Sequence, residues 1–374
     1  MQLALREIAR AKLRFVLLSM AVGLLVFLIL FQQALFGGLV TSFIGAIERQ
    51  NAPVLVYGDQ ARRNVEASLI FPGLAEQVAA VPGVATSGPI GENTFTVDAG
   101  GELQDAAIFG YELGGLGEPT SLIEGRLPEG PGEGVASFGS DNVGFEIGDT
   151  VTVLGEQPSE ITIVGVAQDA RWSVQATVFV SYDTYVQAKQ ALDPAAQVLP
   201  SLIAVQPDDG ADAATLARSI TDAVDGVEAL TRQQAIDENP GVRGVNSSFG
   251  IILALAFMVV VLVVGFFFLI LTVQKSKPLT LLRAVGAPRR YLVQNLLGQI
   301  VVVMAAGILV GIGLTLLVGA ATTGGAIDVT LDPAQVLRTV ALLTVLALLG
   351  GLASVRRVLR IDPIRATVDS GSSL

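Results

Sequence analysis

The amino-acid sequence predicts an α-helical membrane protein with four transmembrane helices and an α+β extracytoplasmic domain inserted between helices 1 and 2. Four long runs of uncharged, mostly apolar residues predict the helices, because about 20 apolar residues in helical form cross the core of a bilayer. One run lies near the N-terminus and three lie after residue 245. The segment between them is acidic and alternates short β-branched runs with helical patterns, which predicts a folded domain in water.

Transmembrane helix 1 and a stalk are expected over residues 15–47. No charge occurs between Arg14 and Glu48, and a helix of these 33 residues would extend roughly 50 Å, more than a bilayer core requires. Basic residues precede this run in segment 1–14, which we expect to be a cytoplasmic amphipathic helix. The apolar run is longer than that of a cleaved signal peptide, which favours a retained anchor.

The three later helices follow one another closely. They are expected over residues 246–273, 292–321 and 337–355. The last run is the shortest and includes Arg338. The segments that join and follow these helices are a cytoplasmic loop over 274–291, a short external loop over 322–336 and a cytoplasmic tail over 356–374.

The charges are sorted between the two sides of the membrane. Segments 1–14, 274–291 and 356–374 hold 13 of the 23 Lys and Arg residues and three acidic residues, whereas 45–245 holds nine basic and 29 acidic residues. Short basic segments mark the cytoplasmic side. We therefore expect a multi-pass protein of the cell membrane with both termini in the cytoplasm and the domain 48–245 outside. Its acidic surface disfavours a nucleic-acid partner.

The sequence disfavours an enzyme. It contains neither Cys nor His, which removes thiolate metal sites and the commonest metal ligand and general base. Neither a G-x-G-x-x-G fingerprint after a strand nor a G-x-x-x-x-G-K-[ST] phosphate loop is present. We predict no catalytic residue, no metal site and no cofactor of its own.

The outer domain shows the turn signals and apolar periods of an α+β fold. The expected strands are 52–57, 94–97, 106–109, 151–154, 161–166, 177–180, 201–205 and 227–230, and the expected helices are 74–81, 182–192 and 211–224. We expect loops over Glu112–Gly148, which is rich in glycine, proline and acidic residues. Trp172, the only tryptophan, is interpreted as a packing anchor in a turn.

The cytoplasmic loop contains a short amphipathic helix in the prediction. Pro278 suits a first helical turn, and Leu279, Leu282 and Val285 then share one face. Gly286 can end the helix. This helix is either an anchor at the lipid interface or a docking surface for a cytoplasmic partner.

Four segments resemble the MacB/FtsX-type permeases of ABC transporters. ALREIARAKLRFVLLSMAVGL is similar to their N-terminal opening, LTLLRAVGAPRRYLVQNLLGQ to their coupling helix and third span, and VRRVLRIDPIRA to their tail. The outer segment EGRLPEGPGEGVAS…VGFEIGDTVTVLG…ITIVGVAQD resembles their extracytoplasmic domain. The resemblance implies a permease subunit that forms a homodimer and binds a separate ABC ATPase, which binds the ATP.

By the same resemblance, the coupling helix would contact the ATPase. The implied ATPase-coupling residues are Leu279, Leu281, Leu282, Arg283, Val285 and Gly286. The family usually has an acidic residue where Pro278 stands, so Arg283 or the backbone would replace that contact. Membrane lipid and a membrane-fusion or other extracellular protein are further expected partners.

The substrate class is predicted from the spans, which hold no ionisable residue at mid-membrane and therefore favour a hydrophobic or amphipathic substrate over a hydrophilic one. Gln32, Gln33 and Phe36 are candidate substrate-facing residues, or they mark where helix 1 leaves the hydrocarbon. A weaker likeness to haem-exporter permeases of Gram-positive bacteria makes haem one candidate. The alternative function is a scaffold without transport that transmits force to an extracellular cell-wall hydrolase.

Overall fold

A computed structural model describes residues 12–137, 143–195, 197–274, 289–322 and 333–359. The chain divides into two compact units. The helical unit takes the chain up to Phe36 and most of the chain from Ser248 on, and the mixed unit takes Gly37–Ser247. The predicted N-terminal amphipathic helix, the coupling helix and most of the external loop and tail lie outside the described residues.

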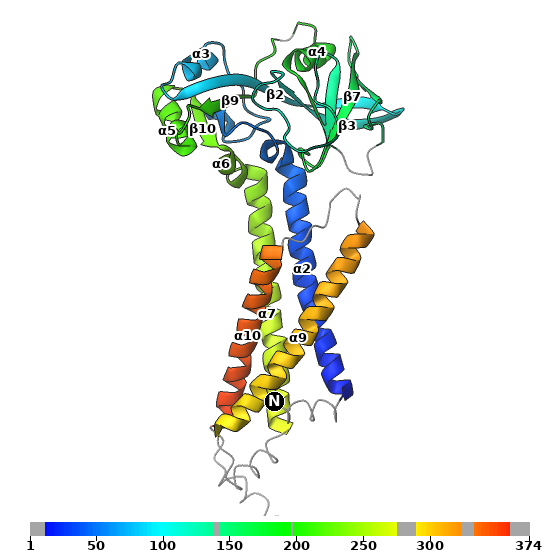
Figure 1. The fold of residues 1–374 in the computed structure, drawn as a ribbon, viewed down its shortest axis with the longest axis vertical. Helices are drawn as coiled ribbons and strands as arrows, with labels where there is room; N and C mark the ends of the chain where they lie inside the picture. Colours follow the sequence, from blue (N-terminus) through cyan, green and yellow to red (C-terminus); the bar gives the residue numbers. More distant parts are fainter. Residues whose placement is uncertain (1–11, 138–142, 196, 275–288, 323–332, 360–374) are drawn as a thin grey trace, which may run out of the picture. The chain divides into compact units, whose positions relative to one another are not determined.

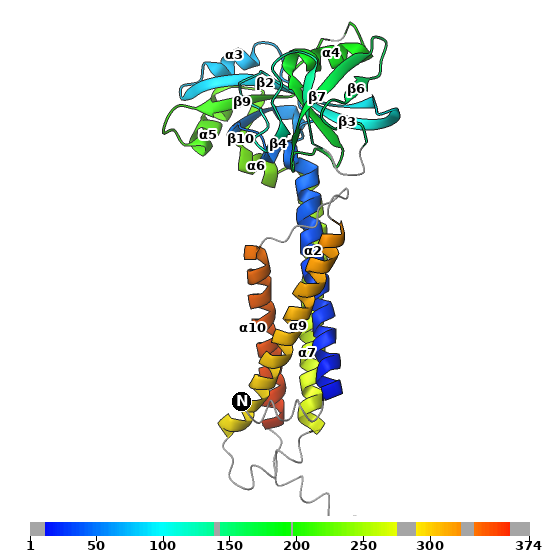
Figure 2. The same ribbon diagram turned by 45° about the vertical axis from the view of Figure 1, so that its right-hand side comes forward.

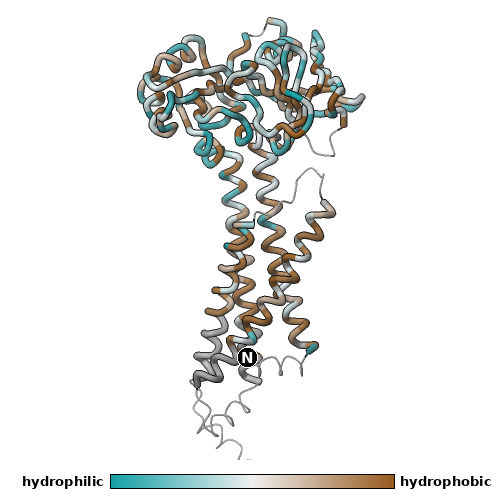
Figure 3. The backbone as a smooth tube through the Cα atoms, in the orientation of Figure 1, coloured by the Kyte–Doolittle hydropathy of each residue, from teal (hydrophilic) through white to brown (hydrophobic). Residues whose placement is uncertain are grey.

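Among the described residues, four long helices run through the helical unit: α2 (Lys12–Glu48), α7 (Pro240–Gln274), α9 (Arg289–Thr322) and α10 (Pro333–Leu359). The last turns of α2 and the first turns of α7 belong to the mixed unit. Apolar residues predominate along the described parts of α2, α7 and α9 (Figure 3). These three contain candidate membrane spans, whereas α10 contains a shorter apolar stretch, Pro333–Leu349. The fourth span therefore stays a prediction. Helix α7 begins at Pro240 rather than at the predicted 246, since proline suits a first helical turn.

The four helices share one apolar core, with Val22 and Val26 of α2 at its centre. Helices α2 and α9 approach each other closely through glycine (Figures 1 and 2). A Cβ added at Gly307 would lie 2.6 Å from a methyl of Val22, and one at Gly311 2.6 Å from a methyl of Val26. This G-x-x-x-G spacing allows the backbones to pack closely, as is common between transmembrane helices.

A single ten-stranded mixed sheet forms the centre of the other unit (Figure 2). Its order is β10-β1-β9-β2-β3-β8-β5-β7-β4, and β6 pairs with β2 and β7. The strands are β1 (Val54–Gly58), β2 (Val84–Ala99), β3 (Glu102–Tyr111), β4 (Leu122–Gly125), β5 (Glu133–Ser137), β6 (Thr150–Val153), β7 (Ser159–Ala167), β8 (Ala176–Ser181), β9 (Leu202–Pro207) and β10 (Val227–Thr231).

The long strand β2 joins the two halves of this sheet. Residues 84–90 pair with β9, and residues 90–99 pair with β3. The remaining short helices are η1 (Asp59–Ala61), α3 (Leu74–Ala79), α4 (Tyr182–Leu192), α5 (Ala213–Ala223) and α6 (Arg232–Asp237). Helix α4 lies against β2 and β3 because Gly91 and Gly110 leave room for the ring of Tyr185.

The predicted strands and helices of this unit are confirmed, and one prediction is wrong. Each expected strand and helix corresponds to an observed one within a few residues, except that β2 is much longer than 94–97. Segment Glu112–Gly148 is not made of loops alone, because it contributes β4 and β5. Both strands are short and pair with β7, which lies later in the chain, so their local pattern is weak.

Candidate functional site

The six predicted coupling residues, Leu279, Leu281, Leu282, Arg283, Val285 and Gly286, lie outside the described residues. Their role in binding an ATPase stays a prediction.

The three candidate substrate-facing residues lie within the helical unit, and two of them contact its other helices. The side-chain oxygen of Gln33 accepts a hydrogen bond from the Thr339 hydroxyl on α10 at 2.9 Å. The ring of Phe36 lies 5.0 Å from that of Phe249 on α7, centroid to centroid. Among the described residues the buried amide nitrogen of Gln32 has no partner. Gln33 and Phe36 therefore connect helices, and a substrate contact stays a prediction.

Within the mixed unit, the end of α2 is held by a segment far away in sequence, which we call the clamp loop (Asp169–Gln175). The backbone nitrogens of Ser173 and Val174 donate to the carbonyls of Phe43 and Ser42 at 3.0 and 2.9 Å, and the Ala46 nitrogen donates to the Arg171 carbonyl at 3.0 Å. A helix normally satisfies its backbone groups internally. These three bonds therefore tie the helix backbone itself to the domain.

Gly45 makes this close attachment possible, and the clamp loop adopts strained backbone angles in forming it. An added Cβ at Gly45 would collide with the Asp169 carbonyl, so no other residue lets the two backbones approach in this way. Asp169, Ser173 and Val174 adopt positive φ angles of 56°, 50° and 64°. Such backbone angles cost on the order of 1–3 kcal/mol each. They are especially rare for a β-branched residue such as Val174. The surrounding contacts must hold the clamp loop in place.

Those contacts come from Trp172 and Arg171. Trp172 is buried, packs edge-on against Phe109 at 5.6 Å, and donates its backbone N–H to the Thr177 hydroxyl at 2.8 Å. The buried guanidinium of Arg171 donates to the carbonyl of Val174 at 2.6 Å. The packing interpretation of Trp172 is thus confirmed. These contacts connect the clamp loop to the sheet through Phe109 on β3 and Thr177 on β8.

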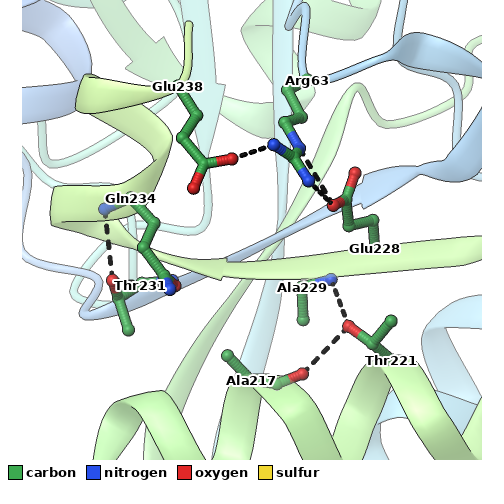
Figure 4. Close-up of polar contacts among 8 residues, drawn as sticks. All are labelled: Arg63, Ala217, Thr221, Glu228, Ala229, Thr231, Gln234 and Glu238. Atoms are coloured by element: carbon green, nitrogen blue, oxygen red, sulfur yellow. Dashed lines mark hydrogen bonds and ion pairs between the residues drawn. The ribbon is translucent and has the colours of Figure 1, made fainter.

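The start of α7 has its own attachment to the mixed unit. The Arg63 guanidinium donates to Glu228 on β10 and to Glu238, which directly follows α6 (Figure 4). The Asn239 side chain accepts from the Gly241 backbone at 2.9 Å, just inside the new helix. These contacts tie the first turn of α7 to the mixed unit.

Two further features support this second attachment. A capping box between Thr231 and Gln234 begins α6 (Figure 4). An added Cβ at Gly241 would collide with the ring of Phe43 on α2, so the two helices are in close contact within this unit. We call the clamp loop together with these α7 contacts the joint.

The sequence predicted none of the joint apart from the burial of Trp172. The one signal was Gly45, an isolated glycine near the end of a helical run, which often marks a close backbone approach. The partner could not be inferred, because Asp169 lies more than a hundred residues later.

Comparisons with known proteins agree with this architecture. The model of the MacB-like periplasmic core domain matches residues 15–223, more than half of the chain. The model of the FtsX-like permease C-terminal domain matches residues 250–363. The chain belongs to the MacB/FtsX-type family of ABC transporter permeases. It is a membrane protein with an extracellular domain, and the joint lies within the part that matches the MacB-like domain.

Two relatives match almost the full length of this permease, and one solved structure matches half of it. HrtB of Staphylococcus haemolyticus, a permease named for hemin transport, is 20% identical, covering 98% of this chain and 99% of its own. An uncharacterized ABC transporter permease of Mycobacterium tuberculosis is 25% identical, covering 97% and 98%. The periplasmic region of MacB from Actinobacillus actinomycetemcomitans is 14% identical with a TM-score of 0.36, covering 50% of this chain and 92% of its own.

Proposed function

We propose that this permease is the transmembrane subunit of an exporter in which a separate ABC ATPase moves the helices and the joint passes that motion to the extracellular domain. The observation that carries the proposal is the attachment of α2: one continuous helix, Lys12–Glu48, whose last turns are bonded through the backbone to the clamp loop. A rigid helix displaced at one end would displace the loop at the other.

The charge distribution supports the orientation of this exporter. Segments 1–14, 274–291 and 356–374 are basic and face the cytoplasm in the proposal, where an ATPase would reach the helix at 279–286. Two copies of the permease and two of the ATPase would form the complete exporter.

The proposed substrate is hydrophobic or amphipathic, because the uncharged spans offer no path for a hydrophilic one. Hemin is the named candidate, since one relative carries that name. Stimulation of the complex's ATPase activity by hemin, compared with other amphipathic compounds, tests it.

Coupling to the ATPase is tested by Leu282→Asp, with Thr280→Asp as the control on the opposite face of the predicted helix. Desolvated apolar anchors dominate protein interfaces, and losing one costs roughly 1–3 kcal/mol. We expect Leu282→Asp to lose co-purification with the ATPase while the permease remains in the membrane, and Thr280→Asp to keep it.

Other outcomes would change the assignment. If Leu282→Asp fails to accumulate in the membrane while Thr280→Asp does, the helix is a membrane anchor. If the ATPase binds and cycles but no compound is exported, and the extracellular domain captures a cell-wall hydrolase, the chain is a force-transmitting scaffold. Normal transport by Leu282→Asp would disprove the coupling role.

A further inference from the structure

A buried carboxyl group lies on β2, the strand that is bonded to the clamp loop through Thr94. Glu92 stands in the middle of β2, where the pairing changes from β9 to β3. Its backbone is firmly bonded: the nitrogen donates to the Ser201 hydroxyl at 3.0 Å, and the carbonyl accepts from the Tyr185 hydroxyl at 3.2 Å. The position of the residue is therefore fixed by hydrogen bonds to its backbone that do not involve its carboxyl group.

The carboxyl group itself is unsatisfied. Glu92 is 4% exposed, and among the described residues neither of its side-chain oxygens has a hydrogen-bond partner. Burial, followed by the nearby charge of Glu66, raises the pKa of Glu92 to about 8, against a smaller opposing effect of Lys189 on α4. The group is therefore protonated at neutral pH and below.

Glu66 links this carboxyl group to the clamp loop. One of its side-chain oxygens accepts a hydrogen bond from the Ser173 hydroxyl at 3.2 Å, and the Ser173 nitrogen donates to α2. A second link runs through Thr94, which is on the same side of β2 as Glu92 and donates to Gln175 at 3.1 Å. The clamp loop is thus bonded both to Glu66, whose charge acts on Glu92, and to Thr94, two residues further along the same strand.

We propose that Glu92 is a proton-sensitive element of the joint, whose loss of a proton loosens the hold of the clamp loop on α2. When the proton passes to solvent, a negative charge remains in the interior beside the Glu66 carboxylate. Repulsion and desolvation are relieved when Glu66 moves away and water enters. Ser173 then loses its acceptor, and the strained loop loses one of the contacts that hold it. The effect of this loosening on export rests on the proposed function.

Trp172 reports on this loop because it is the only tryptophan of the chain. Its accessibility to acrylamide is measured by fluorescence quenching on the full-length permease, without ATPase, in detergent micelles between pH 5.5 and 9.5. We expect the quenching constant to rise at least twofold, with a midpoint near pH 8. The absence of His and Cys leaves few other groups that titrate in this range.

Three variants decide the assignment. Glu92→Gln should keep the low quenching constant at every pH. Glu66→Gln should move the midpoint to lower pH, and Lys189→Gln should move it to higher pH, because these two charges act on Glu92 in opposite directions. If Glu92→Gln does not fold, the opposite shifts of the other two variants still test the proposal.

The proposal is overturned if quenching by the wild-type protein is independent of pH, if Glu92→Gln retains the transition, or if the Glu66 and Lys189 variants leave the midpoint unchanged. None of these measurements requires an ATPase or a substrate. A flat titration in a permease that binds its ATPase would therefore reject the proton-sensitive element and leave the proposed function intact.

Discussion

At the residue scale, the mixed unit contains a strained backbone conformation and a buried polar group that both cost stability. Val174 adopts a left-handed backbone conformation, and the carboxyl group of Glu92 is buried without a partner among the described residues. Such features persist only where neighbouring contacts compensate for them. Val174 belongs to the clamp loop itself, and Glu92 lies on the strand that is bonded to that loop through Thr94. The sequence here thus favours a particular geometry over maximal stability.

The unfolding of the protein should depend on pH through Glu92. The pKa is about 8 when folded and near 4.5 in the unfolded chain, so the folded state holds a proton that the unfolded state has released. Stability should fall as the pH rises from about 4.5 to about 8, by at most a few kcal/mol. Thermal unfolding at pH 5 and pH 8 measures this, and Glu92→Gln should reduce the difference in Tm.

At the element scale, glycines decide where helices can approach other backbones. Gly45 of α2 meets the Asp169 carbonyl, whereas Gly37 of the same helix has open space around its missing side chain. In the helical unit, Gly311 meets α2 while Gly313, on the same helix, has open space. In each helix, one glycine makes a close contact and a second glycine has room for a side chain, so the second serves as a control for substituting the first.

Gly45→Ala should uncouple the domain from the helix. The new methyl group collides with backbone, which cannot yield as a side chain can, so the hydrogen bonds to the clamp loop should break. We expect acrylamide quenching of Trp172 to increase and transport to fall several-fold, with ATPase binding retained. Gly37→Ala should change none of these, and equal behaviour of the two variants would contradict the role of the joint.

Gly311→Ala should weaken the packing of α2 on α9. Its Cβ would lie 2.6 Å from a methyl group of Val26, and overpacking of this kind costs roughly 1–3 kcal/mol. The yield and Tm of the purified permease should drop, while Gly313→Ala should match the wild type. A stable Gly311→Ala protein would show that the two helices can separate at no cost.

At the scale of the whole molecule, the charge distribution predicts the sidedness. Residues 45–245 carry 29 acidic against nine basic residues, and the short basic segments lie at the other ends of the spans. The chain has no cysteine, so one introduced thiol is unique. This makes the orientation in the membrane directly measurable.

A cysteine at Ser159, at the start of β7, should react with an impermeant maleimide in intact cells. A cysteine at Ser276, in the basic segment 274–291, should react only after the cells are opened. Labelling of both variants in lysed cells shows that each thiol is accessible in principle. The reverse pattern would contradict the proposed topology.

The sequence by itself determined three of the four predicted helical spans, the charge asymmetry and most strands, because these depend on local composition and periodicity, which short windows of residues express. It could not determine β4 and β5, whose partner β7 comes later in the chain, nor the contact of Gly45 with Asp169. The environment of Glu92 was likewise hidden, since Glu66, Lys189 and Ser201 approach it from separate parts of the chain. Such contacts form only when distant segments pack together, so only the tertiary structure decided the joint and its buried carboxyl group.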